Sequence, residues 1–597
     1  MRAFRLVWGA AHGWTIAWLA MLAIQGLLPV GVVYVTRLLV DSIAAAIGAG
    51  ATWENFQPVL LYGAMMGGIL LLTEITQIIA EWIRTLQSEL VQDRISALVQ
   101  DKSVSLDLAF FETPQFYDHL YRARSDASSR PLALLESSGG VMQNGVTLVA
   151  MAAVLIPYGW WLPPALLVST LPAFFVVTRW NRRHHDWWTR TTEDRRRTQY
   201  YDIVLTDGLF APEVRLFGLA PHFQSAFRDA RLRLRGERMS MLKAQYRSRL
   251  GAELLALIVS AAAVVWMLRE ALAGTVTLGD LALFYQAFQR GQGVIRALLG
   301  NVGQIYANSL FLGSLFEFLD LRSTVVEPAA PRPVPAKLRT GLAFRNVSFT
   351  YPGSEHEALH DFSLTIPAGK VVAIVGANGA GKSTLFKLLC RFYDPDAGRV
   401  ELDGIDLRDV SLAHLRGRIT YMPQLPIHYQ TTVRENIAMG KLSADPDLDR
   451  IRDAAVAAGV DEAIERLPHQ YDNMLGKWFK DGAELSGGEW QRVAMARAFF
   501  RTAEVILLDE PTSMMDSWSE AAWFSRLRVL AADRTAVLIT HRLTIAARAD
   551  LICVMMNGEI VEAGTHEELL ARSGTYAQSW SDQLRSDPAA VDPVSPA

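Results

Sequence analysis

A glycine-rich loop in the second half of the chain has the residues needed to hold a triphosphate. Residues Ala373–Leu389 read AIVGANGAGKSTLFKLL, which contains the pattern G-x-x-x-x-G-K-[ST] between a β-branched run and a helical stretch. Glycines let the backbone approach the phosphates, and amides at a helix N-terminus bind their charge. Lys382 is placed to neutralise the β- and γ-phosphates, and Ser383 to bind Mg²⁺. The loop residues expected to contact ATP are Gly376, Asn378, Gly379, Gly381, Lys382, Ser383 and Thr384.

A pair of acids follows a second hydrophobic run, EVILLDEPTS, at Glu504–Ser513. Asp509 is placed to hold Mg²⁺, directly or through water, and Glu510 to polarise the attacking water as a general base. Two solvated carboxylates at a strand end are the alternative interpretation. The upstream loop favours ATP hydrolysis with Mg²⁺ as cofactor.

A second phosphate-binding pattern, ELSGGEWQR, lies between these two motifs at Glu484–Arg492. Ser486, Gly487 and Gly488 offer a hydroxyl and exposed amides before a helix. One nucleotide cannot use both phosphate cradles of one chain at this separation. A second copy facing head to tail can use one of them, which predicts a homodimer.

These motifs resemble those of ABC transporters, and the resemblance covers Leu342–Gln583 with the motifs in family order. It implies that Tyr351 in FTYPGS stacks on adenine. It further implies that Gln424 in YMPQ contacts Mg²⁺ or the lytic water, and that His541 in LITHRL touches the γ-phosphate.

The chain departs from the family pattern at two places. The signature usually ends in Gln, whereas Glu489 stands here, and the loop after the acids reads Ser513-Met514-Met515-Asp516 instead of a sequence like S-A-L-D. Neither change removes a phosphate-binding group or the expected base Glu510.

The bulk composition indicates more than one domain and a membrane-embedded part. The chain has 597 residues, too many for one core, and 51% of them are hydrophobic. A net charge of −3 argues against binding of nucleic acid. The two cysteines, Cys390 and Cys553, lie far apart and exclude a disulfide scaffold, which fits a reducing compartment.

Long uncharged runs in the N-terminal half predict six membrane spans. The sequence PYGWWLPP at Pro157–Pro164 predicts a hairpin between the third and fourth spans. The sixth is the weakest, because it carries Arg290 and Arg296, and a soluble amphipathic helix is its alternative. The N-terminal sequence has no cleavage site of small residues, so no removable signal peptide is expected. The expected spans are Gly13–Thr36, Phe56–Thr73 with a continuation past Glu74 toward Trp82, the two halves of Ser137–Thr178, a fifth with its core at Leu254–Leu268, and roughly Leu278–Phe318.

The loops between the spans predict how the chain is oriented. Ser42–Phe56 and the hairpin contain no Lys or Arg, whereas Arg84–Arg130 and Asn181–Arg249 are long and rich in arginine. The positive-inside bias places these two long excursions, both termini and the ATPase domain in the cytosol of a bacterial cell. A multi-pass protein of the cytoplasmic membrane, in contact with membrane lipid, is therefore expected.

The sequence predicts a six-span α-helical transmembrane domain over residues 1–326, followed by an α/β P-loop ATPase domain over residues 342–583. A proline-rich linker at 327–341 separates them, and a flexible tail follows at 584–597. This order resembles ABC exporters, which implies that the tips of both excursions dock on the ATPase domains. Ordinary amphipathic turns are the alternative for these tips. The expected coupling residues are Phe111, Phe116 and Tyr117 in the first tip, and Glu213 and Arg215 in the second.

The substrate is less defined by the sequence. Local motifs around Phe111 and Glu484 resemble exporters of modified peptides such as lanthipeptides, and lipid or hydrophobic-drug export is the alternative. Glu74 and Glu253 are candidates for binding a cationic substrate, because carboxylates in a bilayer tend to face a cavity or a partner. Pairing with arginines or a place near the membrane surface is the other interpretation. Import on the same architecture and ATP-driven gating without pumping are the remaining alternatives.

Overall fold

The computed structural model describes residues 2–50, 52–113, 130–442, 447–513, 515 and 517–586. It divides the chain into two compact units. Unit 1 comprises residues 1–104 and 118–321, and unit 2 comprises residues 105–117 and 322–597. The short segment after the second helix therefore belongs to the C-terminal unit.

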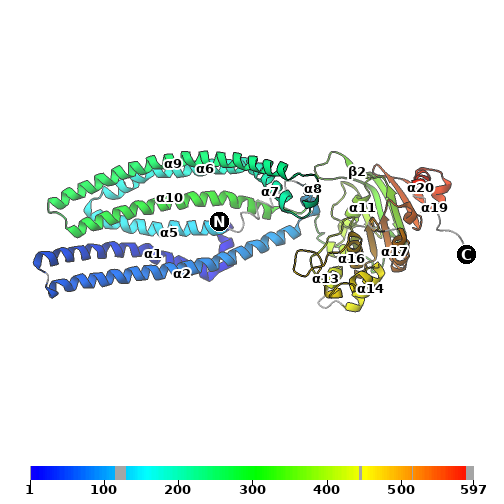
Figure 1. Ribbon diagram of the computed structural model, residues 1–597, viewed down its shortest axis with the longest axis horizontal. Helices are drawn as coiled ribbons and strands as arrows, with labels where there is room; N and C mark the ends of the chain where they lie inside the picture. The colour runs from blue at the N-terminus through cyan, green and yellow to red at the C-terminus, as the bar shows by residue number, and fades with distance from the viewer. Residues whose placement is uncertain are drawn as a thin grey trace. The chain divides into compact units, whose positions relative to one another are not determined.

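The secondary structure of unit 1 is helical in its described residues, and its long helices point along one general direction (Figure 1). Thr277 and Asp280 cap the last helix reciprocally, which fixes where it begins. The helices are α1 (Arg2–Ala49), α2 (Trp53–Ser105), α5 (Arg130–Leu155), α6 (Leu162–Arg190), α7 (Thr192–Thr206), α8 (Ala211–Leu216), α9 (Ala220–Leu272) and α10 (Leu278–Asp320), with a short 3₁₀ turn at Ile156–Tyr158.

Four helices of the described residues are long and apolar enough to cross a membrane: Trp8–Ala49, Trp53–Ser105, Ala133–Tyr158 and Ala220–Leu272. The hairpin lies where the prolines predict it, because α5 ends at Leu155 and α6 begins at Leu162. Neither α6 nor α10 is among the four candidates, so the count of six spans is not confirmed. The chain is a multi-pass membrane protein with a helical membrane domain.

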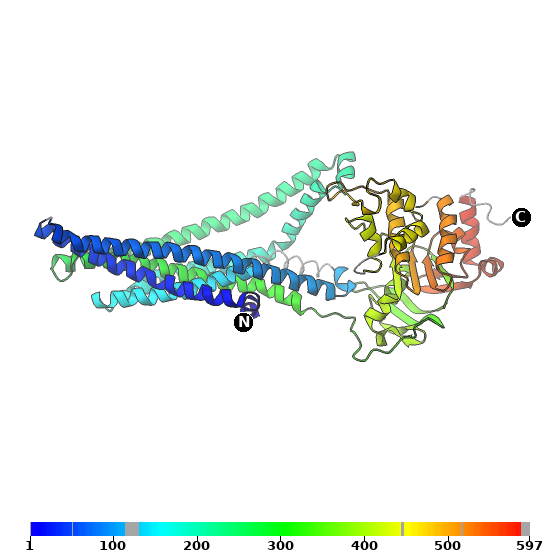
Figure 2. The same ribbon diagram turned by 90° about the horizontal axis from the view of Figure 1, so that it is seen from below.

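Close helix contacts and polar ties hold unit 1 together. A side chain at Gly139 of α5 would meet the Trp18 ring of α1 at 2.0 Å, so the two helices approach closely only because this residue is glycine. Asp280 at the start of α10 accepts from Tyr158 at 2.6 Å and pairs with Arg37 of α1 at 2.8 Å. Figure 2 shows α9, in teal and green, diverging from α1 and α2, in blue.

Unit 2 contains a six-stranded sheet of order β10-β9-β3-β8-β7-β6 and a four-stranded antiparallel sheet of order β2-β1-β4-β5. In the larger sheet β6, β7, β8, β3 and β9 are parallel, and β10 is an antiparallel edge strand. The strands are β1 (Gly341–Thr350), β2 (Glu357–Pro367), β3 (Val371–Gly376), β4 (Ala397–Leu402), β5 (Ile405–Asp406), β6 (Ile419–Met422), β7 (Val505–Asp509), β8 (Thr535–Ile539), β9 (Leu551–Met556) and β10 (Glu559–Gly564).

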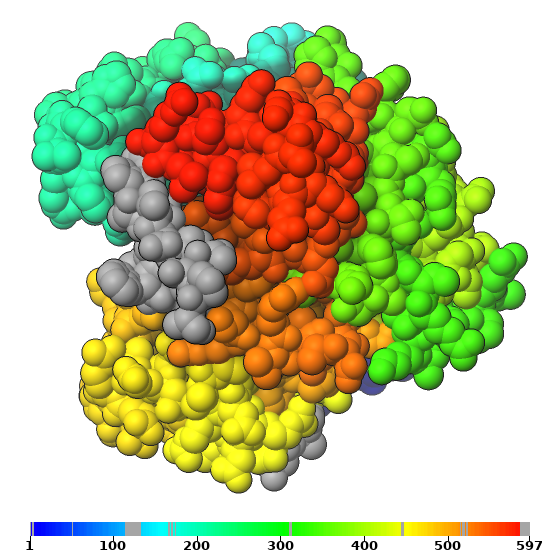
Figure 3. Space-filling model, turned by 90° about the vertical axis from the view of Figure 1, so that its right-hand side faces the viewer, coloured from blue at the N-terminus to red at the C-terminus, as the bar shows by residue number. Residues whose placement is uncertain are grey.

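Helices cover the larger sheet. The helices that lie between β6 and β7 in the sequence form a separate group. The central strands β7 and β8 are buried along their whole length, as their β-branched and leucine-rich sequences predict. Figure 3 shows the helical group around α14, in yellow, apart from the antiparallel strands, in green. The helices are α3 (Leu108–Phe111), α11 (Lys382–Leu389), α12 (Leu412–Gly417), α13 (Val433–Ala438), α14 (Leu448–Ala458), α15 (Asp461–Glu465), α16 (Gly487–Phe500), α17 (Ser517–Leu530), α18 (Leu543–Ala546), α19 (His566–Ala571) and α20 (Thr575–Ser586), with 3₁₀ turns at Leu407–Asp409 and Gln470–Asp472.

The ends of unit 2 differ in detail from the sequence prediction. The first strand begins at Gly341, inside the expected linker, and α20 continues through Ser586, so it includes the first residues of the predicted tail. An α/β ATPase domain after a helical membrane domain is confirmed.

Candidate nucleotide site

The topology of the larger sheet brings four sequence motifs to one edge. The strands β3, β8, β7 and β6 are adjacent and parallel, so their carboxyl ends lie side by side. The glycine-rich loop follows β3, His541 follows β8, Asp509 ends β7 and Gln424 follows β6. The carboxyl edge of a parallel sheet is where ligands bind in this class of fold. Residues scattered over more than 160 positions of sequence thereby share one site.

The glycine-rich loop has the backbone of a phosphate cradle. Gly381 has φ +91° at the N-terminus of α11, and a side chain there would meet the Ala358 carbonyl at 2.5 Å. The Lys382 ammonium donates to the carbonyls of Gly376 at 2.9 Å and Ala377 at 2.7 Å. Burial lowers the pKa of Lys382, while Glu510 and Asp509 oppose the shift. The ammonium therefore points across the loop, where a phosphate would offer it stronger partners than carbonyls.

The acid pair lies against the loop. Asp509 is 3% exposed, and burial raises its pKa, although a hydrogen bond with Ser383 opposes this. Glu510 accepts from Gln424 Nε2 at 3.0 Å, and its other carboxylate oxygen lies 3.1 Å from His541 Nε2. The three residues expected to act on the lytic water thus meet at one carboxylate.

The backbone of Glu510 is held in an unusual conformation. Its φ is +49°, in the left-handed region that non-glycine residues seldom adopt. Its amide donates to the Ile539 carbonyl of β8 at 3.0 Å. Gln491, buried at 1% exposure, donates to the Glu510 carbonyl and to Ser513 Oγ, both at 3.1 Å. Sequence reasoning missed Gln491, although its position within GGEWQR signalled a role.

Tyr351 lies beside the loop helix. Its hydroxyl is 3.0 Å from Thr384 Oγ1, and its ring contacts Phe349 and Tyr393 edge-on at centroid distances of 5.0 and 5.5 Å. The Lys387 ammonium lies 4.7 Å from the ring centroid. The ring is half-buried and oriented by these neighbours, which is compatible with the predicted stacking on adenine.

The signature sequence begins a helix. Ser486 is the N-cap of α16 and forms a capping box with Glu489, whose carboxylate accepts from the Ser486 amide at 2.9 Å and hydroxyl at 2.8 Å. Burial of the Glu489 carboxyl acts to raise its pKa. The hydrogen bonds from Ser486 outweigh this effect, so the pKa of Glu489 is lowered. Gly487 and Gly488 form the first turn. Glu489 therefore has a structural role in the cap: its carboxylate accepts from the Ser486 amide and hydroxyl, and its own amide donates to Ser486 Oγ at 3.3 Å.

The donor set fits Mg²⁺ and a nucleotide. Mg²⁺ prefers hard oxygen ligands, which the Ser383 hydroxyl, the Asp509 carboxylate and the Gln424 side-chain oxygen can supply. The glycine conformations, the Lys382 ammonium and the N-terminus of α11 suit a phosphate chain. That these residues bind ATP and Mg²⁺ stays a prediction.

The other predicted residues are divided between the two units. Phe111 ends α3 in unit 2, whereas Phe116 and Tyr117 lie outside the described residues. In unit 1, Glu213 and Arg215 lie on α8, and Glu74 is exposed on α2. Glu253 pairs with Arg296 at 2.8 Å, so its charge has a partner within the chain. Met515 is buried, and Met514 and Asp516 lie outside the described residues.

The fold and the site define a P-loop ATPase domain that follows a helical membrane domain, and comparisons with known proteins agree. The family described as ABC transporter matches residues 359–513. The subtilin transport ATP-binding protein SpaT of Bacillus subtilis is 27% identical over 575 residues, 96% of this chain and 92% of that protein. The ATP-dependent lipid A-core flippase of Thiobacillus denitrificans is 39% identical over 366 residues, 61% of this chain and 62% of that protein, so this alignment spans less than two thirds of the relative.

A solved structure described as a bacterial Atm1-family ABC exporter with ATP bound superposes with a TM-score of 0.80 at 27% identity. It covers 96% of this chain and 99% of that chain. Residues 359–513 therefore match the ABC transporter family, and the chain as a whole resembles ABC exporters in sequence and fold. It is an ATP-hydrolysing transporter with the domain order of an ABC exporter, which confirms the resemblance seen in the sequence.

Proposed function

We propose that two copies of this chain form a homodimer in the cytoplasmic membrane that hydrolyses ATP to export an amphipathic substrate. The observation that carries the proposal is the meeting of Gln424, His541 and Glu510 beside the Lys382 loop. Six spans per copy, with both termini and the ATPase domain in the cytosol, complete the arrangement. The full-length likeness to an ABC exporter structure supports it.

In this mechanism the residues of one copy bind the phosphates and prepare the water. Lys382 and the amides of the glycine loop would hold the phosphate chain, and Ser383, Asp509 and Gln424 would hold Mg²⁺, which would neutralise charge on the transferring phosphate. Glu510 accepts a proton from the water, and Gln424 and His541 keep its carboxylate in place. His541 also contacts the γ-phosphate.

The second phosphate cradle supplies the reason for a dimer. Ser486 and the first turn of α16 of one copy contact the nucleotide held by Lys382 of the other. Each ATP then holds the two ATPase domains together. The movement of these domains changes the arrangement of the membrane helices. Neither cradle can complete a site without the second copy.

The transmission to the membrane helices runs through the tips of the excursions. Around α8, the large apolar side chains Leu209, Leu216 and Phe217 are 81%, 78% and 64% exposed. An ATPase domain offers a cavity of about 320 Å³ beside the Gln424 loop, lined by apolar residues together with Arg416, Arg497 and Arg501. The apolar tip and the acid Glu213 suit this basic, apolar cavity, and we infer that α8 docks on an ATPase domain there.

The substrate we favour is a modified peptide. The alignment with the subtilin transport protein covers nearly the whole chain, including the membrane domain. A lipid substrate is the second candidate, because the lipid A-core flippase is more similar in sequence over a shorter stretch. Glu253 is already paired with Arg296, so Glu74, exposed on α2, is the better candidate of the two for a cationic group.

A crosslinking experiment tests the dimer. In the double variant Asn378→Cys and Ser486→Cys, we expect crosslinks between chains that form faster with ATP. Burial raises the pKa of the native Cys390 and Cys553 thiols to about 12, so they react slowly and need no replacement. Crosslinks only within a chain would exclude the head-to-tail dimer.

Vectorial transport separates export from the alternatives. In liposomes with the ATPase domain outward, we expect inward movement of a fluorescent lanthipeptide that depends on ATP and stimulates hydrolysis. Stimulation by lipid A in place of the peptide would favour the flippase. Hydrolysis without movement of either substrate would favour a membrane regulator that gates without pumping.

A further inference from the structure

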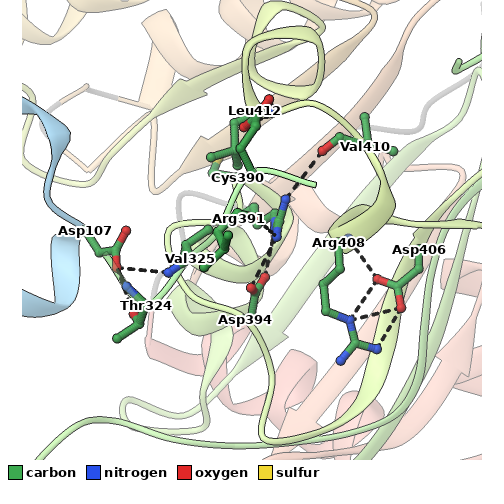
Figure 4. A network of polar contacts seen from close by, with 12 residues as sticks. Asp107, Thr324, Val325, Cys390, Arg391, Asp394, Asp406, Arg408, Val410 and Leu412 are labelled. Carbon is green, nitrogen blue, oxygen red and sulfur yellow. Dashed lines mark hydrogen bonds and ion pairs between the residues drawn. The ribbon is translucent and has the colours of Figure 1, made fainter. Parts of the chain in front are cut away.

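The segment that follows α2 is built into the ATPase domain. Leu106 and Ala109 are buried, and Ala109 belongs to the hydrophobic cluster formed by β1, β2 and α11. Asp107 accepts from Thr324 Oγ1 at 2.8 Å and from the Val325 amide at 3.0 Å (Figure 4). The chain that leaves α2 and the chain that leaves α10 are therefore fastened together inside unit 2.

The same place is tied further into the ATPase domain. Arg391 donates to the Val326 carbonyl at 2.9 Å and pairs with Asp394 at 2.9 Å, as Figure 4 shows for the latter pair. Glu327 accepts from the Leu412 amide at 3.1 Å. These contacts fix the segment around α3 as a part of the domain that carries the nucleotide site.

Glu112, just after α3, extends this segment to the loop helix. Its carboxylate pairs with the Lys387 ammonium at 2.7 Å and accepts a hydrogen bond from the Tyr393 hydroxyl. Lys387 lies on α11, the helix that begins at Lys382. Tyr393 is 5% exposed, so its hydroxyl needs the partner that Glu112 provides.

Lys387 in turn contacts the ring expected to carry the adenine. Its ammonium lies 4.7 Å from the Tyr351 centroid, within the range of a cation–π interaction. The Tyr351 and Tyr393 rings meet edge-on at 5.5 Å, and the Tyr351 hydroxyl is 3.0 Å from Thr384 Oγ1. Glu112 therefore contacts two of the groups that orient Tyr351, Lys387 and Tyr393.

We propose that Glu112 is a positioning residue that sets the orientation of Tyr351 through Lys387 and Tyr393, and so tunes the affinity for the adenine base. This inference rests on the proposed ATP site. Glu112 directly follows α3, seven residues after α2 ends at Ser105, so a displacement of this segment alters base binding. By thermodynamic reciprocity, base binding then displaces this segment. Sequence reasoning singled out the aromatic residues of this tip and missed its carboxylate.

The test compares a ligand that has a base with one that lacks it. Inorganic tripolyphosphate can occupy the phosphate loop but makes no contact with Tyr351. In the full-length Glu112→Gln variant, which keeps the side-chain shape and loses the charge, we expect the dissociation constant of ATP to rise roughly three- to tenfold. The dissociation constant of tripolyphosphate should be unchanged, and kcat at saturating ATP should stay near that of the wild type.

A double-mutant cycle identifies the route. In a Tyr351→Ala background, Glu112→Gln should have no further effect on ATP binding, because the platform is already lost. Equal weakening of ATP and tripolyphosphate would show that Glu112 only supports the fold, and an additive effect with Tyr351→Ala would exclude action through the ring. Either result, or unchanged ATP binding, overturns the proposal.

A second variant tests the proposal in case Glu112→Gln does not fold. Lys387→Met removes the ammonium from the ring at similar chain length, and the same selective loss of ATP over tripolyphosphate is expected. Glu355→Gln, on the exposed loop after Tyr351, is the matched control and should change neither constant. If Lys382→Ala leaves both ligands bound normally, the proposed ATP site itself is wrong, which is distinguishable from failure of the Glu112 inference.

Discussion

Replacement of Glu510 by glutamine removes the proposed general base but keeps the contacts of the side chain, so it separates the two contributions. The carboxylate meets Gln424 Nε2 at 3.0 Å and His541 Nε2 at 3.1 Å. A glutamine amide can accept from Gln424 through its oxygen and donate to a neutral His541 through its nitrogen. Its backbone cost at φ +49° is that of glutamate, so the fold and ATP binding should be preserved.

The expected loss in rate follows from the proton alone. A positioned general base contributes about 10²- to 10⁴-fold. This corresponds to a rise of about 3 to 5 kcal/mol in the activation free energy. Because both neighbours of the side chain keep a partner, nearly all of this loss should appear in kcat and little in the dissociation constant for ATP.

The assay is steady-state ATP hydrolysis in nanodiscs, together with equilibrium ATP binding and the fraction of closed dimer. We expect a kcat reduced at least a hundredfold, near-normal binding and an ATP-trapped dimer. Glu567→Gln on the exposed surface of α19 is the control with the same chemical change. A kcat within tenfold of the wild type would exclude Glu510 as the base and direct attention to another group near the water.

Three further predictions concern the phosphate loop and the signature helix. Lys382→Ala should raise the dissociation constant for ATP at least about tenfold and abolish turnover, measured by equilibrium binding and phosphate release, since the phosphates lose their charge partner. Ser486→Ala and Lys382→Ala chains, each inactive alone, should regain partial activity when mixed, because one of the two sites then carries neither change; full activity of the Ser486→Ala homodimer would refute the contact across the interface. Glu489→Ala should lower the free energy of unfolding by about 1 kcal/mol through loss of the capping box, whereas Glu489→Gln should retain most of it, as followed by thermal melting. Since the folded pKa of Glu489 is lowered, this stabilisation is present above the unfolded pKa near 4.5 and is lost as the pH falls through the folded value, so wild type and Glu489→Ala should converge in acid.

The nucleotide motifs were predictable because each is a local device. The turn of the loop needs glycines at adjacent positions, and Lys382 and Ser383 follow in the same short stretch, so their spacing alone indicates a phosphate cradle. The hairpin between α5 and α6 was equally local, since its prolines end one helix and begin the next. Helices α6 and α10 carry basic residues and are not among the four candidate spans of the described residues, so the sequence pattern was not decisive for them.

By itself, then, the sequence determined the order of the helical membrane domain and the α/β ATPase domain, and it predicted the chemistry of the phosphate loop, the acid pair and the signature helix. Only the tertiary structure decided that Gln424, Glu510 and His541 share one carboxylate, because that depends on the strand order β3-β8-β7-β6 and on no local spacing. The same holds for Glu112, whose partners Lys387 and Tyr393 lie more than 270 residues away. A long-range ion pair leaves no periodic mark on either segment, so it becomes visible only when the chain has folded.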